Sequence, residues 1–283
     1  MMKWKELIKN VAKEQKVTLP EVEKVDNGMT YPELFSYITM ASGLNNTHRI
    51  VRNMISCYNT PNEKNMMVRE YARHHEIPIL TTNYDDYLDY EPKLRSRWRK
   101  NVSQNIKYIE EFYTSPHKGV KPFDDAAVWH INGHVQYPLS MRLSFTDYCN
   151  QIVHLTRMIP LQKELQDGRI DAKKKKAFEH SWLEIFFRKK LCIVGLGLGK
   201  DEIVLRWLLL RRKVLWNRLV GSKDKTTGWY CYSLKTEMKL SESIENKEEI
   251  QGKKMLLNSL GIVPVEFPTI EELYEQIFKS ERK

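Results

Sequence analysis

The residues best suited to chemistry follow a short apolar run, Ile77–Leu80, at the point where the chain turns polar. Thr82-Asn-Tyr-Asp-Asp86 places an amide and neighbouring carboxylates side by side. The Asn83 amide offers both a hydrogen-bond donor and an acceptor, and the Asp85 carboxylate has oxygens that can accept from both hydroxyls of a ribose. An Asx turn followed by a helix N-cap explains the same residue types, and in isolation it is the commoner explanation.

A second group lies in Val128-Trp-His-Ile-Asn-Gly-His134. If this segment stays extended, the alternation of side chains along a strand puts His130, Asn132 and His134 on one face. A histidine pair can bind a metal, but the sequence has no H-E-x-x-H pattern and no third ligand close by, so we expect no metal site. A histidine packed inside a strand is the commoner outcome.

The third group is the glycine run Gly195-Leu-Gly-Leu-Gly199, which precedes Asp201 and a helix. Glycines allow the backbone to approach a ligand closely, and the start of the helix offers free N–H groups. The spacing differs from the G-x-G-x-x-G of the dinucleotide fingerprint. A tight strand-to-helix turn also selects glycine, and Asp201 can simply complement the helix dipole.

Each of these groups follows an apolar segment with the length of a buried parallel strand, namely 77–82, 128–132 and 191–194. In an open α/β sheet, ligands bind at the carboxyl ends of the strands. Three polar strand ends therefore predict a nucleotide pocket. Two further strands are expected at 228–232 and 262–266.

From residue 71 onward, helices alternate with these strands, which is the signature of βαβ units and a parallel sheet. We expect a single α/β domain over residues 1–283. Its helical part spans 1–70, and residues 71–283 form a Rossmann-like parallel sheet with helices on both faces and helical insertions.

Local signals mark the helices. Thr30-Tyr-Pro-Glu33 reads as a capping box, residues 2–15 are amphipathic, and Thr269-x-x-Glu272 opens the last helix. A long helix over 146–165 is expected to break at its proline. Residues 87–126 are polar and contain several prolines, so we expect a partly helical excursion that overhangs the site.

The composition places the chain among globular proteins, with 283 residues, 41% hydrophobic and 29% charged. No apolar run approaches the roughly 20 residues of a membrane span, and the first residues show no secretory signal. The four cysteines are scattered without a C-x-x-C pair, which excludes a Cys₄ zinc ribbon and gives no hint of a disulfide framework. The cytoplasm is the expected compartment.

The net charge is +10, with basic runs at Lys173–Lys176, Arg188–Lys190 and Arg211–Lys213. Attraction to nucleic acid or to phosphate-bearing ligands is one explanation. A solvated helix face is the commoner one for lysine runs. Aromatic residues do not interleave with these lysines as a single-strand binding groove requires.

Taken in order, these elements resemble the SIR2-like domains of bacterial anti-phage defence proteins. Thr82-Asn-Tyr-Asp85 is similar to the family's T-x-N-x-D element, and Trp129–His134 sits where the family has a histidine–glycine strand end. Ser140–Tyr148 resembles the serine and Asp-Tyr segment that follows, and Gly195–Asp201 resembles the late glycine element. The resemblance covers roughly residues 70–280 and includes Leu260-Gly-Ile262 before the last strand.

The resemblance implies a Rossmann-like fold, NAD⁺ as ligand, and cleavage of the nicotinamide–ribose bond. Catalytic roles then fall to Asn83, His130, Asn132 and His134. The nucleotide-binding residues would be Thr82, Tyr84, Asp85, Gly195, Gly197, Leu198 and Asp201. Deacylating sirtuins carry a zinc module with four cysteines, so the missing C-x-x-C pair favours hydrolysis of NAD⁺ over deacylation.

Two features depart from the family's pattern. Asn132 stands where the family usually has histidine, and asparagine cannot act as a general base. His130 or His134 would have to substitute, or the chemistry proceeds without a base. In relatives, a strand and a G-A-G-x-S loop precede a helix similar to Trp4–Ile8, whereas here that helix begins the sequence. Two explanations remain open: the chain lacks this phosphate loop, or its true start lies upstream.

Without that first strand, a neighbouring strand exposes a row of unpaired backbone groups. We therefore expect weak or no NAD⁺ binding by the chain as written. We also expect association with a second copy or with a partner defence protein through the exposed edge.

Three functions follow. The leading one is an NAD⁺ glycohydrolase that acts as a defence effector. The runner-up is a catalytically weak or inactive module that binds NAD⁺ or ADP-ribose and assembles with a separate effector. The third, nucleic-acid binding, rests on net charge alone and predicts an affinity that falls steeply with salt.

Overall fold

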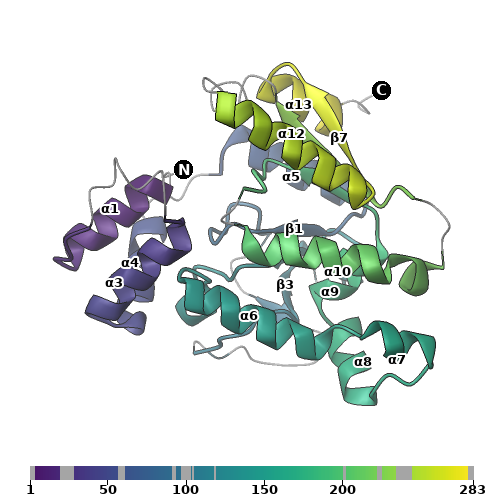
Figure 1. The fold of residues 1–283 in the computed structure, drawn as a ribbon, viewed down its shortest axis with the longest axis horizontal. Helices are drawn as coiled ribbons and strands as arrows, with labels where there is room; N and C mark the ends of the chain where they lie inside the picture. The colour runs from purple at the N-terminus through teal and green to yellow at the C-terminus, as the bar shows by residue number, and fades with distance from the viewer. Residues whose placement is uncertain are drawn as a thin grey trace.

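The computed structural model describes residues 4–19, 29–56, 61–90, 94–96, 103, 105–117, 119–199, 202–221, 225–233 and 244–279. Asp201 lies outside these residues. Within them the chain is mixed α/β, with two small sheets surrounded by helices (Figure 1). None of the helices in this part of the chain combines the length and the apolar character needed to cross a membrane.

The first sheet has the strand order β1-β4-β3-β2. Its strands are β1 (Ile79–Thr81), β2 (Arg95–Ser96), β3 (Phe112–Thr114) and β4 (Val128–His130). β1 and β4 run parallel, while β3 is antiparallel to both β4 and β2. The expectation of a partly helical excursion over 87–126 is therefore wrong for its described residues. Phe112 and Tyr113 are buried, and Tyr113 packs on Trp129 of β4, which draws this segment into the sheet.

The second sheet is parallel throughout, with the order β5-β6-β7. Its strands are β5 (Leu191–Val194), β6 (Gly228–Ser233) and β7 (Ile262–Phe267), connected by helices α10 (Ile203–Val220) and α12 (Ile244–Ser259) and followed by α13 (Ile270–Phe278). The strands are those that the sequence predicts. Their grouping differs from the prediction, because the described strands form one mixed and one parallel sheet in place of a single parallel one.

A buried arginine of α10 connects this helix to the second sheet and to the segment that precedes it. Arg212 of α10 donates to the backbone carbonyl oxygens of Phe186 (3.2 Å), Lys189 (2.6 Å) and Thr227 (2.8 Å). Its guanidinium also lies 4.1 Å from the centre of the Trp216 ring. Three carbonyl partners offset much of the cost of burying the charge, so Arg212 fixes the start of β5 and β6 against α10.

The N-terminal helices pack as a bundle with its own apolar core. They are α1 (Trp4–Glu14), α3 (Tyr31–Ser42) and α4 (Leu44–Ser56), followed by α5 (Glu63–His74), which leads into β1. The predicted capping box is confirmed: the Glu33 N–H donates to Thr30 Oγ1, and the Thr30 N–H donates to the Glu33 carboxylate. The core of this bundle also contains Tyr84, Met141 and Leu143, so the bundle packs directly against the strand ends.

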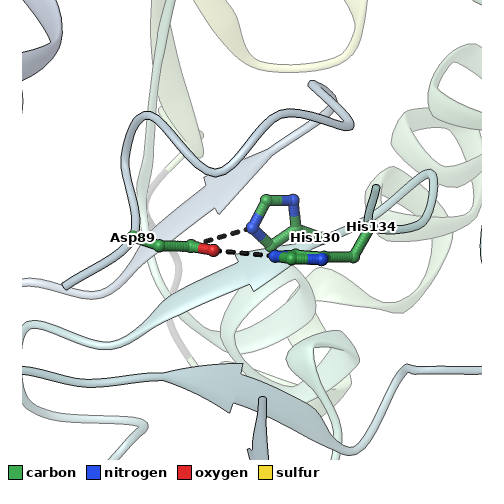
Figure 2. Close-up of side chains that lie close together, drawn as sticks. All are labelled: Asp89, His130 and His134. Atoms are coloured by element: carbon green, nitrogen blue, oxygen red, sulfur yellow. Dashed lines mark hydrogen bonds and ion pairs between the residues drawn. The ribbon is translucent and has the colours of Figure 1, made fainter. Parts of the chain in front are cut away.

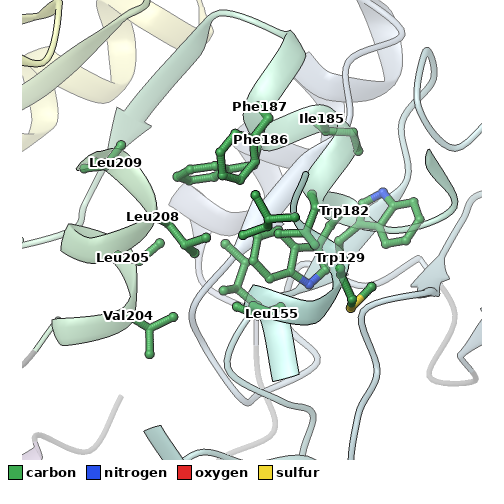
Figure 3. Close-up of a cluster of buried hydrophobic side chains, with 14 of the residues drawn as sticks. Trp129, Leu155, Trp182, Ile185, Phe186, Phe187, Val204, Leu205, Leu208 and Leu209 are labelled. Carbon is green, nitrogen blue, oxygen red and sulfur yellow. The ribbon is translucent and has the colours of Figure 1, made fainter. Parts of the chain in front are cut away.

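The remaining helices enclose the main core, which Figure 3 shows around Trp129, Trp182, Phe186 and Leu208. These helices are α6 (Phe145–Met158), α7 (Gln162–Gln166), α8 (Ala172–Glu179) and α9 (Trp182–Arg188). The break expected at Pro160 is confirmed. The lysine run Lys173–Lys176 lies in α8, which ends at Glu179, and buried Ser181 leads the chain into α9 while its hydroxyl donates to the Phe178 carbonyl oxygen.

The turn after β4 yields a first testable prediction. Gly133 has φ +108°, and a Cβ there would lie 2.2 Å from the Ser140 carbonyl oxygen. Gly133→Ala therefore has to displace backbone and adopt a strained conformation. We expect it to lower the free energy of unfolding by about 2 kcal/mol or more, measured by urea denaturation.

Gly252→Ala in α12 is the matched control, because nothing lies within 4 Å of its added Cβ. A helical Gly→Ala change should be neutral or stabilise by roughly 0.5–1 kcal/mol. Equal stability of the two variants would contradict the tight turn at Gly133.

Candidate functional site

The polar ends of β1 and β4 lie side by side. Thr81 is the register partner of His130, and the chain continues to pair beyond both strands. The Ile131 N–H donates to the Thr81 carbonyl oxygen (2.8 Å), and the Val135 N–H donates to that of Tyr84 (2.7 Å). Two of the three polar strand ends named from the sequence are thus brought together.

His130 and His134 also meet, but not by the alternation expected of an extended strand. β4 ends at His130, the chain bends over Ile131 and Asn132, and Gly133 adopts a left-handed conformation. This bend folds the chain back so that the two imidazole ring centres lie 4.4 Å apart. Both rings point toward Asp89, as Figure 2 shows.

Asp89 is the centre of this group, and its carboxylate accepts three hydrogen bonds. Oδ1 accepts from Nε2 of His130 (2.9 Å) and from the hydroxyl of Thr114 on β3 (2.9 Å). Oδ2 accepts from Nε2 of His134 (2.7 Å). The side chains of Asp89, His130 and His134 are all at most 1% exposed, so the network is sealed from solvent.

The hydrogen-bond partners of the two imidazole rings show which of their nitrogen atoms carry a proton. Nδ1 of His130 lies 2.9 Å from the Asn83 carbonyl oxygen, which can only accept, while its Nε2 faces the carboxylate. Both nitrogens therefore donate, which makes His130 an imidazolium. Nδ1 of His134 accepts the Gln136 N–H (3.0 Å), so this ring is neutral with its proton on Nε2.

The expected pKa values agree with this assignment. Burial alone lowers the pKa of His130, but the charge and hydrogen bond of Asp89 and the Asn83 carbonyl raise it above the ordinary histidine value. Burial and the neighbouring charge of His130 lower the pKa of His134. Burial alone raises the pKa of Asp89, yet the two histidines outweigh burial and hold it well below the usual range. The network is one buried ion pair with a neutral third member.

The same three side chains bring potential metal-ligand atoms within 4.8 Å of one another. Ligation at about 2.0–2.1 Å with tetrahedral geometry would require the hydrogen-bonded atoms to move apart by roughly 0.5 Å. It would also require a lone pair on Nε2 of His134, where the Gln136 contact places the proton. The hydrogen bonds satisfy every polar atom of the three side chains without an ion, so we assign the network a positioning role.

Asn83 is the predicted site residue with a side chain left open to a ligand. Its backbone is held at both ends, because its N–H donates to Thr81 Oγ1 (3.1 Å) and its carbonyl oxygen accepts from His130. Its half-buried amide group makes no hydrogen bond to any other described residue. Thr82 beside it is likewise half-buried.

Asp85 forms a local turn. Its Oδ1 accepts the Tyr87 N–H (3.3 Å), and its side chain is largely buried. Burial raises the pKa of Asp85, with the Tyr87 hydrogen bond acting in the opposite direction. This is the Asx turn that the sequence offered as the simpler explanation.

Tyr84 and Asn132 are both buried. The Tyr84 ring lies in the core of the N-terminal bundle beside Trp4, and its hydroxyl donates to the Arg142 carbonyl oxygen. Its ring therefore packs into the bundle core, and its hydroxyl is already engaged. Asn132 has a buried amide oxygen, Oδ1, that no hydrogen-bond donor of the described chain reaches.

The glycine run follows β5 on the second sheet. Gly195 and Leu198 have φ +70° and +48°, and the Leu198 side chain is buried in the main core. The Gly197 carbonyl oxygen accepts from Lys253 Nζ (3.2 Å) and from the Tyr230 hydroxyl (3.5 Å). Leu198 can thus offer a ligand its backbone only.

Sequence reasoning missed Asp89 and Thr114. Asp89 follows the Thr82–Asp86 group by three residues and was not grouped with it, and Thr114 belongs to a strand that the sequence did not predict. The available signal was the pair of histidines themselves, because two buried imidazoles require a nearby carboxylate or carbonyl partner.

No protein-family model matches the chain, and no curated protein matches it. The site is therefore interpreted from its own geometry.

Asp89→Asn tests the network. The substitution leaves His130 without a counter-charge, so we expect the free energy of unfolding at pH 6 to fall by about 3–5 kcal/mol. The raised pKa of His130 stabilises the fold fully below the ordinary histidine value and less as the pH rises through the raised value. The difference in free energy of unfolding between wild type and Asp89→Asn should therefore become smaller from pH 6 to pH 9.

Asp86→Asn is the matched control, since the hydrogen bond that this half-buried carboxylate makes within the described residues is a 3.5 Å contact with Gln136. It should change stability by no more than about 0.5 kcal/mol. Urea denaturation across the pH series measures both. If the free energy of unfolding of wild type exceeds that of Asp89→Asn by the same amount at every pH, His130 is not charged.

Proposed function

We propose that this chain is a SIR2-like NAD⁺ hydrolase with a Rossmann-like arrangement of its strands. The observation that carries the proposal is Asn83, at the carboxyl end of a parallel strand, on a backbone fixed by the Asp89–His130 pair. Its amide group bonds to no other residue in the described part of the chain. Polar groups in that position are where α/β proteins bind nucleotides. The order of the elements along the chain resembles the SIR2-like family.

The reaction converts NAD⁺ and water into ADP-ribose, nicotinamide and a proton. The bond between the ribose and the nicotinamide nitrogen breaks with both electrons going to that nitrogen, which loses its positive charge. The ribose carries the developing positive charge until water adds and releases its proton to solvent. The Asn83 amide oxygen can orient this water and stabilise the developing charge.

In this proposal His130 and His134 do not contact the substrate, because both rings are buried and hydrogen-bonded. They position Asn83 through the bond from His130 to its carbonyl oxygen. Asn132 contributes an unpaired buried acceptor, Oδ1, at the neighbouring strand end. No residue then serves as a general base, which suits a reaction in which bond breaking precedes the attack of water.

The nucleotide would lie across the strand ends toward the glycine run. In this proposal Thr82 and Asp85 would contact the ribose, and the backbone of Gly195, Gly197 and Leu198 would contact the phosphates. Asp85 must exchange its bond to the Tyr87 N–H for ribose hydroxyls.

Nicotinamide release from NAD⁺, followed by chromatography, tests the proposal. Asn83→Ala should reduce turnover at least 100-fold, on the order of one lost polar group in a preorganised site. Its melting temperature should stay within a few degrees of wild type, because the amide makes no contact that folding needs.

Asn258→Ala, an exposed position on α12, is the control and should turn over NAD⁺ like wild type. Absence of turnover by the wild-type chain, alone and with a partner, would remove the hydrolase and leave the second candidate.

The second candidate is a weak or inactive NAD⁺-binding module that assembles with other chains, and the sheet edges favour it. Within the described residues, β1 ends the first sheet and β5 ends the second, each without a neighbour on its outer side. Leu80 of β1 and Leu191 and Ile193 of β5 border the same main core. Unpaired parallel edges beside one core suit a strand from a second copy or from a partner defence protein.

A proline substitution can test the β5 edge without breaking its sheet. The Leu191 N–H donates to the Thr227 carbonyl oxygen, which places it on the β6 side. Residues alternate sides along a parallel strand, so the Cys192 N–H faces the open edge. We expect Cys192→Pro to abolish assembly with little change in melting temperature.

Ile193→Pro is the matched control, since it removes an N–H on the β6 side and should unfold the second sheet. Analytical ultracentrifugation measures the assembly state of both. An oligomer that persists in Cys192→Pro would show that assembly does not use this edge.

A further inference from the structure

Helix α10 is apolar on two opposite sides. Its inner side packs into the main core through residues such as Leu205, Leu208 and Leu215. Its outer side nevertheless carries Leu210 and Val214, which are 50% and 49% exposed. Exposed apolar side chains that share one side of a helix are typical of an interaction surface.

The outer residues follow a heptad spacing. Ile203, Trp207, Leu210, Val214 and Asn217 are separated by four, three, four and three residues, and all are half-buried or exposed, although Trp207 also packs against the edge of the main core. This is the a/d spacing with which one helix packs along another. We call these five residues the α10 seam. Figure 1 shows α10 lying across the front of the molecule.

Basic residues border the seam on both sides. Arg206 and Lys213 are seven residues apart on one side, and Arg211 and Arg218 are seven apart on the other, which are the g and e positions of the same heptads. None of the four side chains makes an ion pair or hydrogen bond to another described residue. α10 itself contains no acidic residue.

These features specify the chemistry of the partner. Charges at e and g positions select the partner helix, and four uncompensated cations select Glu or Asp opposite them. Two copies of α10 facing each other would place like charges together, which disfavours self-pairing through this face. Asn217 within the seam suits helix–helix register and is unfavourable against lipid.

We propose that the α10 seam is the docking site for an amphipathic helix of a partner protein, with apolar residues in its own seam and acidic residues beside it. At 18 residues α10 is about 27 Å long, enough for roughly two and a half heptads of contact. The proposal does not depend on NAD⁺ chemistry, because the seam lies on the outer face of the helix.

A designed peptide tests the proposal with the full chain. The probe is a fluorescein-labelled helix of about 21 residues, three heptads, with Leu and Ile in the seam and Glu at the e and g positions. A second peptide carries Lys at those positions. Fluorescence anisotropy should show binding of the Glu peptide and at least tenfold weaker binding of the Lys peptide.

Charge reversal supplies the decisive comparison. The double variant Arg211→Glu, Arg218→Glu should no longer bind the Glu peptide and should bind the Lys peptide instead. Leu210→Ala should weaken the binding of either peptide. Lys173→Glu combined with Lys175→Glu on α8 removes the same charge from exposed positions elsewhere and should leave binding unchanged. Thermal unfolding verifies that each variant folds.

Three results would overturn the proposal. The first is no binding of the Glu peptide to the wild-type chain. The second is equal weakening by the α8 variant, which indicates attraction by net charge alone. The third is a combination of results with phosphatidylserine–phosphatidylcholine vesicles. If the wild-type chain binds these vesicles, and Leu210→Ala and the α10 charge reversal both abolish vesicle binding while the same variants still bind the peptide, the face is a lipid surface.

Discussion

The arrangement of the candidate site depends on one buried carboxylate. Asp89 joins Thr114 on β3 to the segment that contains His130, at the end of β4, and His134, after the turn. A buried charge costs several kcal/mol unless its lone pairs are satisfied, so these segments can depart little from their places without stranding it. Through His130, the same constraint fixes the carbonyl group of Asn83.

Much of the fold was predictable because its signals are local. β1, β4, β5, β6 and β7 were each predicted from a short apolar run, and the capping box at Thr30 and the break at Pro160 act within one helical turn. The grouping of strands into sheets was not predictable in the same way. β3 is recruited by packing between Tyr113 and Trp129, a contact that no periodicity in residues 87–126 announces.

The candidate site likewise contains residues that were predictable from local sequence and residues that were not. Asn83, His130 and His134 were identified from residue type and position at strand ends, and the structure brings them together. Asp89 was missed because no spacing in the Asp85–Asp89 stretch shows that the chain brings this carboxylate back to the two histidines. Tyr84 and Leu198 were grouped with the site by sequence proximity, but burial of their side chains is decided by the bundle and by the main core. Neighbourhood in sequence does not determine the direction of a side chain.

The outward direction of the α10 seam follows from the interior of the molecule. Arg212 lies on the opposite side of the helix from Leu210 and Val214, and its three backbone carbonyl partners come from the end of α9, the start of β5 and the start of β6. A rotation of α10 about its axis would break these bonds and leave a charge buried without acceptors. The core therefore holds the helix in one orientation, and that orientation presents the apolar seam and its basic borders to solvent.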